Sequence, residues 1–373
     1  MPVLNTTQTD TLNEPMFFGS ALNIARYDVV KYPIFEKLTQ QQLGFFWRPE
    51  EVSLTQDNRD FKNQPELVTR IFTENLKYQI LLDSVQGRSP LLAILPYVSL
   101  PELEACIIAW SFYESLHSRS YTHIIRNVYN DPSVVFDNII TNPEILKRAK
   151  DVTKHYDDFI EYQTMINNYG FGLVYINDIE YDLNEYDRHK KLLLMLVAIN
   201  ALEGVRFYVS FCCAFAFAEL RLFDGNANIV ELIARDENVH LGIVQNIIKL
   251  YRAENPLFNQ VFLENVDLLY VLYDQVVEQE KEWANYLFRD GVSMIGLNAE
   301  LLCQYVEYIA NKRMKTIGLK SVYSQKTNPC SWIDTYLKSG NKQSAPQETN
   351  IVSYLTSALD SNIDVSDFSN FSL

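Results

Sequence analysis

Glycine and proline are scarce in this 373-residue chain, at 12 and 13 residues, or about 7% together. Average proteins contain roughly 12% of these two residue types. Because β-sandwiches and β-barrels need frequent turn formers, this shortage argues against an all-β fold and predicts long helices with few breaks. A hydrophobic fraction of 47% is enough for a substantial core and excludes global disorder. The expected fold class is therefore all-α.

Positive charge is also scarce, since 32 Lys and Arg oppose 47 Asp and Glu, for a net charge of −15. This balance argues against nucleic acid or an anionic membrane surface as the main partner. The five cysteines are odd in number, irregularly spaced and without a C-x-x-C motif, so we expect no disulfide framework and no zinc site. The N-terminus lacks a basic-then-apolar signal pattern, which predicts a cytoplasmic protein.

Apolar periodicity predicts the helices, and breaks between them divide the chain into three parts. We expect an N-terminal segment over 1–60 that packs on a helical bundle, the bundle itself over 61–336, and a flexible polar tail over 337–373. Two glycines and an Asn-Asp turn between β-prone residues predict a small β-hairpin at 169–182. The expected helices of the bundle cover 65–87, 101–130, 142–165, 192–218, 227–252, 256–289 and 298–316.

The most apolar of these stretches, Leu192–Ala218, contains 22 apolar residues out of 27. A transmembrane helix is the obvious alternative. Glu203 and Arg206 lie in its middle, however, where each would be costly at a bilayer centre. We therefore predict the buried central helix of a helical bundle. Within such a helix, Glu203 either pairs with Arg206 or binds a cation, because an unpaired buried carboxylate is unfavourable.

Two Glu-x-x-His motifs, Glu114-x-x-His117 and Glu237-x-x-His240, occur on predicted helices. Residues three apart share one helix face, so each motif can present a carboxylate and an imidazole to one point. A single motif of this kind would most often be an exposed helical pair. Here a carboxylate precedes each motif on an earlier apolar helix: Asp83 lies 31 residues before Glu114, and Glu203 lies 34 residues before Glu237.

The repeated pattern supplies four carboxylates and two imidazoles from four antiparallel helices. Ferritin-like di-iron bundles are built from this set of side chains. Carboxylate with imidazole suits iron or manganese better than it suits thiol-binding metals. The sequence therefore predicts a ferritin-like di-iron helical bundle with extra helices.

A tyrosine is expected beside this site. Tyr121 lies seven residues after Glu114 and so faces the same side of its helix. Phe207 and Phe211 follow Glu203 by four and eight residues, and Ile233 precedes Glu237 by four, so they can form an apolar wall around the phenol. Ordinary core packing explains the Phe and Ile residues equally well, but a buried hydroxyl needs a partner.

With these residues in place, the chain resembles the radical-generating small (beta) subunit of class Ia ribonucleotide reductase, of the enterobacterial and T-even-phage type. The resemblance extends from about residue 14 to the C-terminus and is weakest over 165–190. The segments that carry it are EPMFFG (14–19), FFWRPEE (45–51), LDSVQGRS (82–89), HSRSYTHIIRN (117–127), RFYVS (206–210) and ARDE (234–237).

The resemblance implies an oxo-bridged di-iron centre with two Fe ions per chain, with Mn as a possible replacement. One metal would be bound by Asp83, Glu114 and His117, and the other by Glu203, Glu237 and His240. By the same resemblance, Tyr121 would hold a stable tyrosyl radical. Trp47 and Asp236 would form a relay with His117, although Trp47 could be a core residue and Asp236 a surface charge.

The resemblance also implies partners. Tyr354 and Glu348 match tail residues of the family, in which the C-terminal tail binds the large (alpha) subunit and passes the oxidising equivalent to it for the reduction of ribonucleotides to deoxyribonucleotides. Members of the family are homodimers that need O2 and an electron donor for radical assembly. The alternative function is that of another di-iron carboxylate oxidase, such as a hydroxylase or a desaturase.

Overall fold

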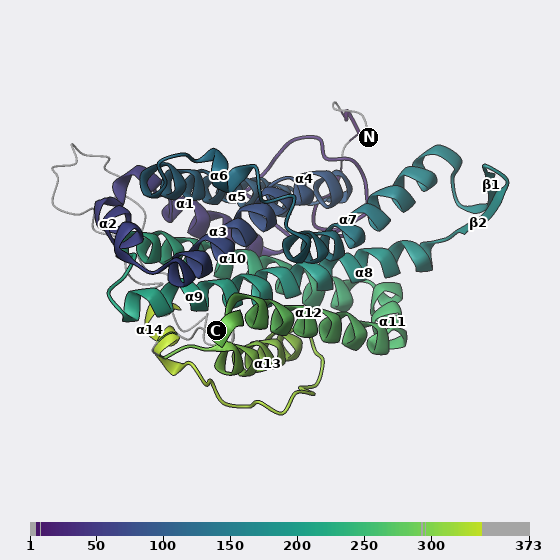
Figure 1. Ribbon diagram of the computed structural model, residues 1–373. Helices are drawn as coiled ribbons and strands as arrows, with labels where there is room; N and C mark the ends of the chain where they lie inside the picture. The colour runs from purple at the N-terminus through teal and green to yellow at the C-terminus, as the bar shows by residue number, and fades with distance from the viewer. Residues whose placement is uncertain (1–4, 8, 292–293, 295, 338–373) are drawn as a thin grey trace.

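Helices dominate the computed structural model, which describes residues 5–7, 9–291, 294 and 296–337 (Figure 1). The one sheet among the described residues is a two-stranded antiparallel hairpin. The predicted all-α class and ferritin-like bundle are confirmed. The helices are α1 Pro33–Gly44, α2 Thr55–Asn63, α3 Glu66–Gln86, α4 Ser89–Ala93, α5 Pro101–Val128, α6 Ser133–Phe136, α7 Pro143–Tyr169, α8 Glu185–Ala201, α9 Phe207–Glu219, α10 Asp224–Glu254, α11 Pro256–Glu264, α12 Val266–Leu287, α13 Ala299–Thr316 and α14 Asp334–Leu337.

Four helical segments form the centre of the bundle. Helix α3 packs on α5 and α9, and α10 packs on the same two helices. The long helices start where the sequence provides favourable first residues: a proline opens α5, and the Asn142 side chain accepts hydrogen bonds from the first turn of α7. The outer helices α1, α2, α7, α12 and α13 cover this centre, so the side chains that face one another on the four central segments are excluded from water.

The region before residue 60 contains two helices, α1 and α2, which the sequence pattern did not predict. Both pack on α5 and α10. Their pattern is weak because α2 is short and strongly polar, and it buries Asp57 and Asp60 instead of an apolar stripe. These carboxylates accept backbone N–H groups at the start of α10, from Phe223, Gly225 and Asn226. Partners distant in sequence therefore hold α2 in place.

The apolar stretch expected as one helix over 192–218 is interrupted. Helix α8 ends at Ala201, a π-helical turn covers Leu202–Arg206, and α9 continues from Phe207. By length and composition, Glu185–Glu219 could cross a membrane, but 94% of its most apolar window is buried inside the protein. The segment is a core helix, as predicted. The single helix expected over 256–289 is likewise two helices, α11 and α12, which meet at Asn265.

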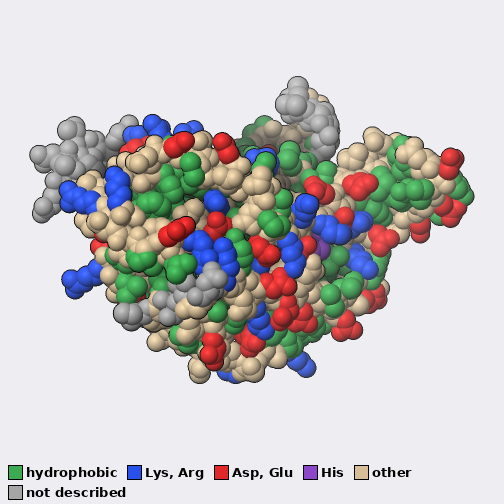
Figure 2. Space-filling view, viewed as in Figure 1, with side chains coloured by type: hydrophobic (Ala, Val, Ile, Leu, Met, Phe, Trp, Pro, Cys, Tyr) green, Lys and Arg blue, Asp and Glu red, His purple; other side chains and the backbone are tan. Residues whose placement is uncertain are grey.

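The predicted hairpin is confirmed. Strands β1 Gly172–Ile176 and β2 Ile179–Leu183 pair with Ile176 opposite Ile179. The two-residue turn between them, Asn177 and Asp178, has positive φ at both positions, which matches the right-handed twist of a hairpin. The hairpin projects from the ends of α7 and α8 (Figure 1) and carries exposed hydrophobic side chains (Figure 2).

Candidate metal centre

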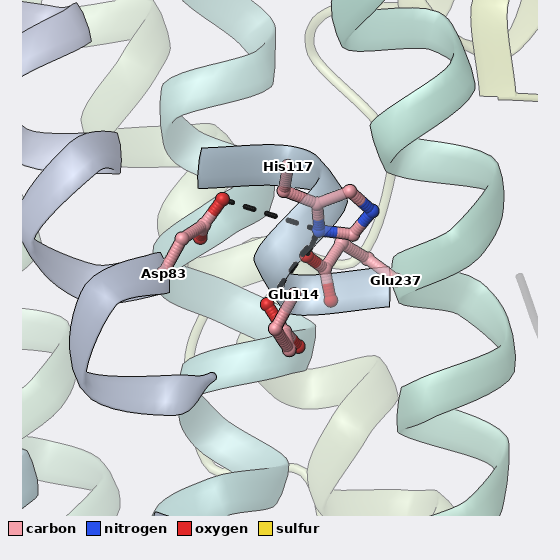
Figure 3. Close-up of side chains that lie close together, drawn as sticks. All are labelled: Asp83, Glu114, His117 and Glu237. Carbon is pink, nitrogen blue, oxygen red and sulfur yellow. Dashed lines mark ion pairs between the residues drawn. The ribbon is translucent and has the colours of Figure 1, made fainter. Parts of the chain in front are cut away.

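The six predicted ligands converge in the middle of the bundle, and each is fully buried. Asp83 comes from α3, Glu114 and His117 from α5, Glu203 from the π-helical turn, and Glu237 and His240 from α10. They form two groups whose potential ligand atoms lie within 4.8 Å of one another. Figure 3 shows the first group, in which the other three side chains point toward the His117 ring. The groups are Asp83, Glu114, His117 and Glu237, and Glu114, Glu203, Glu237 and His240.

Glu114 and Glu237 lie between the two imidazoles. From His117 Nδ1, the nearest oxygens of these carboxylates are 3.5 Å and 3.1 Å away. From His240 Nδ1, the other oxygen of each carboxylate is 3.1 Å and 2.9 Å away. Each carboxylate thus offers one oxygen to each half of the site, which is the arrangement of a bridging ligand. Asp83 and Glu203 belong to one group each.

The donor set fits divalent or trivalent cations. Both oxygens of Asp83 and one oxygen each of Glu114, Glu203 and Glu237 are buried without a hydrogen-bond donor among the described residues. Buried polar atoms are normally paired, so such a cluster indicates a missing positive partner. Burial, followed by the neighbouring carboxylates, raises the pKa of Asp83 and of Glu203 well above the usual value. With all four carboxylates ionised, the site would hold more negative charge than two imidazoles can balance.

The histidines respond to the same imbalance. Burial alone would lower the pKa of His240, but the charges of Glu237 and Glu114 raise it to about 9. For His117, burial is again outweighed, chiefly by the hydrogen bond to Asp236, and its pKa is raised. Both shifts favour the protonated imidazole, as expected beside several carboxylates.

Glu203 does not pair with Arg206, so the ion-pair interpretation of this helix is wrong. Because the π-helical turn adds a residue, it alters the relative directions of the two side chains. The Arg206 guanidinium binds Glu280 at 2.8 Å and Gln279 at 2.7 Å. Glu203 instead accepts a hydrogen bond of 2.5 Å from Gln86 Nε2 and keeps its other oxygen in the site. Single π-helical turns are frequent at functional sites.

Trp47, Asp236 and His117 form one hydrogen-bonded chain. Trp47 Nε1 donates to Asp236 Oδ2 at 2.8 Å, and the same oxygen lies 3.3 Å from His117 Nε2. Both Trp47 and Asp236 are 2% exposed, which contradicts the interpretation of Asp236 as a surface charge. Trp47 lies just after α1, so this series of hydrogen bonds connects the N-terminal segment of the protein to the buried cluster of carboxylates and histidines.

Tyr121 is fully buried, with its hydroxyl beside Asp83 but in no hydrogen bond of standard geometry among the described residues. Burial first, and then the charge of Asp83, raises the pKa of this phenol well above its usual value. Phe207, Phe211 and Ile233 are also fully buried, and the rings of Phe207 and Phe211 stack at 6.0 Å. Their packing as a wall around Tyr121 stays a prediction. Tyr354 and Glu348 lie outside the described residues.

Three side chains that were not predicted from the sequence hold the carboxylates of Glu114 and Glu203 in place. Trp110 Nε1 donates to Glu114 Oε1 at 2.9 Å, and Tyr156 donates to Gln86 Oε1 at 2.8 Å, which fixes the Gln86 amide against Glu203. Helical spacing contained a signal for two of them. Trp110 precedes Glu114 by four residues, and Gln86 follows Asp83 by three, so each shares a helix face with a ligand.

The fold and the buried cluster together define a ferritin-like helical bundle with a carboxylate and histidine metal site. Comparison with known proteins then gives the family. The family model for the ribonucleotide reductase small chain matches residues 25–329. This chain belongs to that family. A small subunit of ribonucleotide reductase implies a large subunit as its partner.

Relatives extend the match over nearly the whole chain. The ribonucleoside-diphosphate reductase 1 subunit beta of Escherichia coli O157:H7 is 52% identical, over 98% of each chain. The subunit beta of enterobacteria phage T4 is 42% identical, over 97% of this chain and 96% of its own. Among solved structures, the R2 subunit from Clostridium botulinum superposes with a TM-score of 0.75 at 25% identity, covering 90% of this chain and 98% of that one.

Proposed function

We propose that this chain binds two iron ions and uses them to generate a stable radical on Tyr121 for ribonucleoside-diphosphate reduction. The observation that carries the proposal is the convergence of two Glu-x-x-His motifs and two single carboxylates in one buried cluster. One iron would be held by Asp83, Glu114 and His117, and the other by Glu203, Glu237 and His240. Manganese is the alternative metal, since a protein of similar fold from Streptococcus sanguinis has been solved in a dimanganese(II) form.

A bound iron pair would supply the reduction of O2, and with it the oxidising power to convert Tyr121 to a radical. The residues of this chain place the phenol. Tyr121 lies on α5 one turn beyond His117, and its hydroxyl is beside Asp83. Because the side chain is fully buried, water and external reductants cannot reach the ring. The buried Phe207, Phe211 and Ile233 are the proposed apolar surroundings of the radical.

The chain of Trp47, Asp236 and His117 is the proposed route for the extra electron. The indole is hydrogen-bonded to a carboxylate that also contacts a metal-ligating imidazole, so charge at Trp47 is coupled to the centre without an intervening water. Asp236 holds Nε2 of His117, which leaves Nδ1 directed at Glu114 and Glu237. This orientation is the one that metal binding through Nδ1 requires.

The remaining parts of the function involve partners. We propose that the cytoplasmic protein binds the large subunit through its tail over 337–373, with Tyr354 and Glu348 in the path that carries the oxidising equivalent. The large subunit would then reduce the nucleotide. By its resemblance to the family, the segment from Phe368 to Leu373 is the proposed docking peptide.

A homodimer is proposed through the outer face of α1 and α5. Leu43, Phe46, Ile108 and Phe112 are each at least 50% exposed there, and the two Phe rings stack at 6.2 Å. Contiguous exposed apolar side chains are a feature of protein interaction surfaces. Replacing Ile108 and Phe112 by Glu should convert the dimer to a monomer in sedimentation, whereas an unchanged mass would place the interface elsewhere.

The central test is low-temperature EPR and optical absorption after addition of ferrous iron and O2. We expect a tyrosyl signal in the wild type that is absent in Tyr121→Phe, while the variant keeps the same iron content. Iron uptake without an organic radical in the wild type would instead favour the alternative, a di-iron oxidase of the hydroxylase or desaturase type. Deletion of 354–373 should leave the radical intact and abolish reductase activity with the large subunit.

A further inference from the structure

A buried charged cluster outside the metal centre joins the two segments that carry the single carboxylates. Arg206 of the π-helical turn and Tyr78 of α3 both contact Glu280 of α12. These three side chains are at most 1% exposed. The π-helical turn also carries Glu203, and α3 also carries Asp83. One carboxylate outside the ligand set therefore contacts both segments.

The contacts with Glu280 converge on one of its oxygens. The Tyr78 hydroxyl donates to Glu280 Oε1 at 2.6 Å, and one terminal nitrogen of Arg206 donates to the same oxygen at 2.8 Å. The other terminal nitrogen of Arg206 donates to Gln279 Oε1 at 2.7 Å. Because the guanidinium is planar and rigid, contacts with two neighbouring residues of α12 fix both its position and its orientation.

Each contact with Glu280 is made on a different side of its segment from the ligand. Tyr78 precedes Asp83 by five residues, which in an α-helix is a rotation of about 140°, so the two side chains leave α3 in different directions. Arg206 reaches α12, whereas Glu203 directs its carboxylate toward Gln86 and the site. The cluster around Glu280 can therefore hold the two segments without occupying the metal site.

The backbone of the π-helical turn is held by another helix. Arg313 of α13 donates from Nε to the Gly204 carbonyl at 3.0 Å, and the Phe207 N–H donates to the Leu202 carbonyl across the turn. The turn thus has a side-chain contact with α12 and a backbone contact with α13, and these two helices pack on each other. A change at Arg206 removes the first contact and leaves the second in place.

This cluster is a poor source of stability. Removing a guanidinium and a carboxylate from water is costly, and their attraction offsets that cost only when the remaining polar atoms are also satisfied. Here Arg206 Nε and Glu280 Oε2 are buried with no hydrogen-bond partner in the described part of the chain. Apolar side chains of similar size are often as stabilising as a pair of this kind. What the pair supplies is direction, because its hydrogen bonds fix the atoms that they join.

We propose that Glu280 is a positioning residue of the metal centre. By holding Arg206 and Tyr78, it fixes the π-helical turn relative to α3, and so fixes Glu203 relative to Asp83. These two carboxylates belong to different halves of the site, so Glu280 sets how the halves are placed relative to each other. The inference rests on the proposed metal centre, and its test distinguishes a failure of the one from a failure of the other.

The test replaces the whole cluster by apolar side chains of similar size, in a triple variant with Tyr78→Phe, Arg206→Met and Glu280→Leu. Removing all three partners together leaves none of them with an unpaired charge or hydroxyl. Arg148, whose Nε lies 4.0 Å from Glu280, keeps its closer ion pair with Glu144 at 3.1 Å. We therefore expect the midpoint of urea unfolding to stay close to that of the wild type.

The probe is isotopically enriched ferrous iron, added without O2 to the full-length apo protein and followed by Mössbauer spectroscopy and by iron content after desalting. In the wild type we expect two ferrous ions per chain. In the triple variant we expect about 10–100-fold weaker iron binding and changed quadrupole splittings, because the carboxylates are no longer held in register. Amide hydrogen exchange over 202–206 should also be faster in the apo variant, which is a measurement that needs no metal.

Two further variants complete the test. Tyr78→Phe keeps the ion pair of Arg206 with Glu280 and removes only the hydrogen bond to α3, so it should change the quadrupole splittings while two ferrous ions still bind. Glu282→Gln is the matched control, because Glu282 is a half-exposed carboxylate on the same helix that pairs with Lys147 at 2.6 Å. The control should give the wild-type spectrum and iron content.

The outcomes separate the two proposals. A folded triple variant with the iron affinity and spectrum of the wild type would overturn the positioning role of Glu280. If the triple variant does not fold, Tyr78→Phe decides, and a wild-type spectrum in that variant would overturn the role. A wild type that does not bind two ferrous ions would instead contradict the proposed metal centre itself, whatever the variants show.

Discussion

The two halves of the metal centre carry the same sequence pattern in different surroundings. In the α5 half, Nε2 of His117 is held by Asp236 and through it by Trp47. In the α10 half, Nε2 of His240 is buried and has no hydrogen-bond partner among the described residues. A carboxylate behind a ligating imidazole fixes its orientation and increases its basicity. The repeated motif therefore provides the proposed ligands, and neighbours that are not repeated make the surroundings of the two halves unequal.

The single carboxylates differ in the same way. Asp83 lies in the regular helix α3, and neither of its oxygens has a hydrogen bond of standard geometry from the described residues, although Tyr121 lies beside it. Glu203 lies on a π-helical turn and has one oxygen bound by Gln86. Asp83, in the half beside Tyr121, is thus less constrained by hydrogen bonds than Glu203, in the other half. Four substitutions test this difference between the two halves.

The largest effect should follow loss of a carboxylate that serves both halves. In Glu237→Ala, both imidazoles lose a neighbour within 3.1 Å, so we expect metal affinity to fall by more than about 100-fold at both positions. Asp83→Ala, the matched variant, removes a ligand from one half and should keep part of the iron. Iron per chain after anaerobic loading and desalting measures the difference, and equal loss in both variants would contradict the bridging position of Glu237.

A smaller effect is expected when the support behind His117 is weakened. Asp236→Asn keeps a hydrogen-bond acceptor for Trp47 but removes the charge that faces the imidazole. We expect about 10–100-fold weaker metal binding in the α5 half and slower radical formation in stopped-flow absorption. Asp224→Asn, an exposed site at the start of the same helix, is the control. If the two variants formed the radical at the same rate, Asp236 would have no role in assembly.

The pairing of Glu with His in each motif was predictable from sequence, because helical spacing places the two residues of a motif on one face. The helices that carry the ligands were predictable for the same reason. The π-helical turn was not, since Leu192–Ala218 is apolar on every side and its periodicity contains no sign of an added residue. The alternative in which Glu203 pairs with Arg206 is wrong, because Arg206 binds Glu280 and Gln279 instead.

The chain of Trp47, Asp236 and His117 could not be derived from spacing either. Trp47 and Asp236 are 189 residues apart, and only the tertiary fold brings them within 2.8 Å. Their role was suggested by the family resemblance. Helix α2 was not predicted, because its buried Asp57 and Asp60 bind backbone N–H groups at the start of another helix. Such contacts leave no local pattern in the sequence.

The π-helical turn that carries Glu203 also contains Gly204, which packs closely against Arg313. A Cβ added at Gly204 would lie 2.8 Å from Arg313 Cγ, and Arg313 Nε also donates to the Gly204 carbonyl. We expect Gly204→Ala to lower the free energy of unfolding by about 1–3 kcal/mol through this overlap. In Gly242→Ala the nearest atom is 4.0 Å away, so the control should be stabilised by about 0.5–1 kcal/mol. Denaturant unfolding of the apo proteins measures both values, and equal shifts would show that the turn tolerates a side chain.

The smallest effect should come from Tyr156, which reaches Glu203 only through Gln86. Tyr156→Phe removes one buried hydrogen bond, to Gln86 Oε1, and should cost about 0.5–1.5 kcal/mol of stability. Because Gln86 then loses the contact that orients its amide, the α10 half should bind metal more weakly while the α5 half is unchanged. Tyr175→Phe removes an exposed tyrosine hydroxyl that binds Glu180 in the hairpin, so it should leave stability and both metal positions as they are. Stepwise metal titration followed by absorption separates the two metal positions. Equal weakening of metal binding in both halves would mean that Tyr156 acts on the bundle as a whole. The constraint on Glu203 would then not distinguish the two halves.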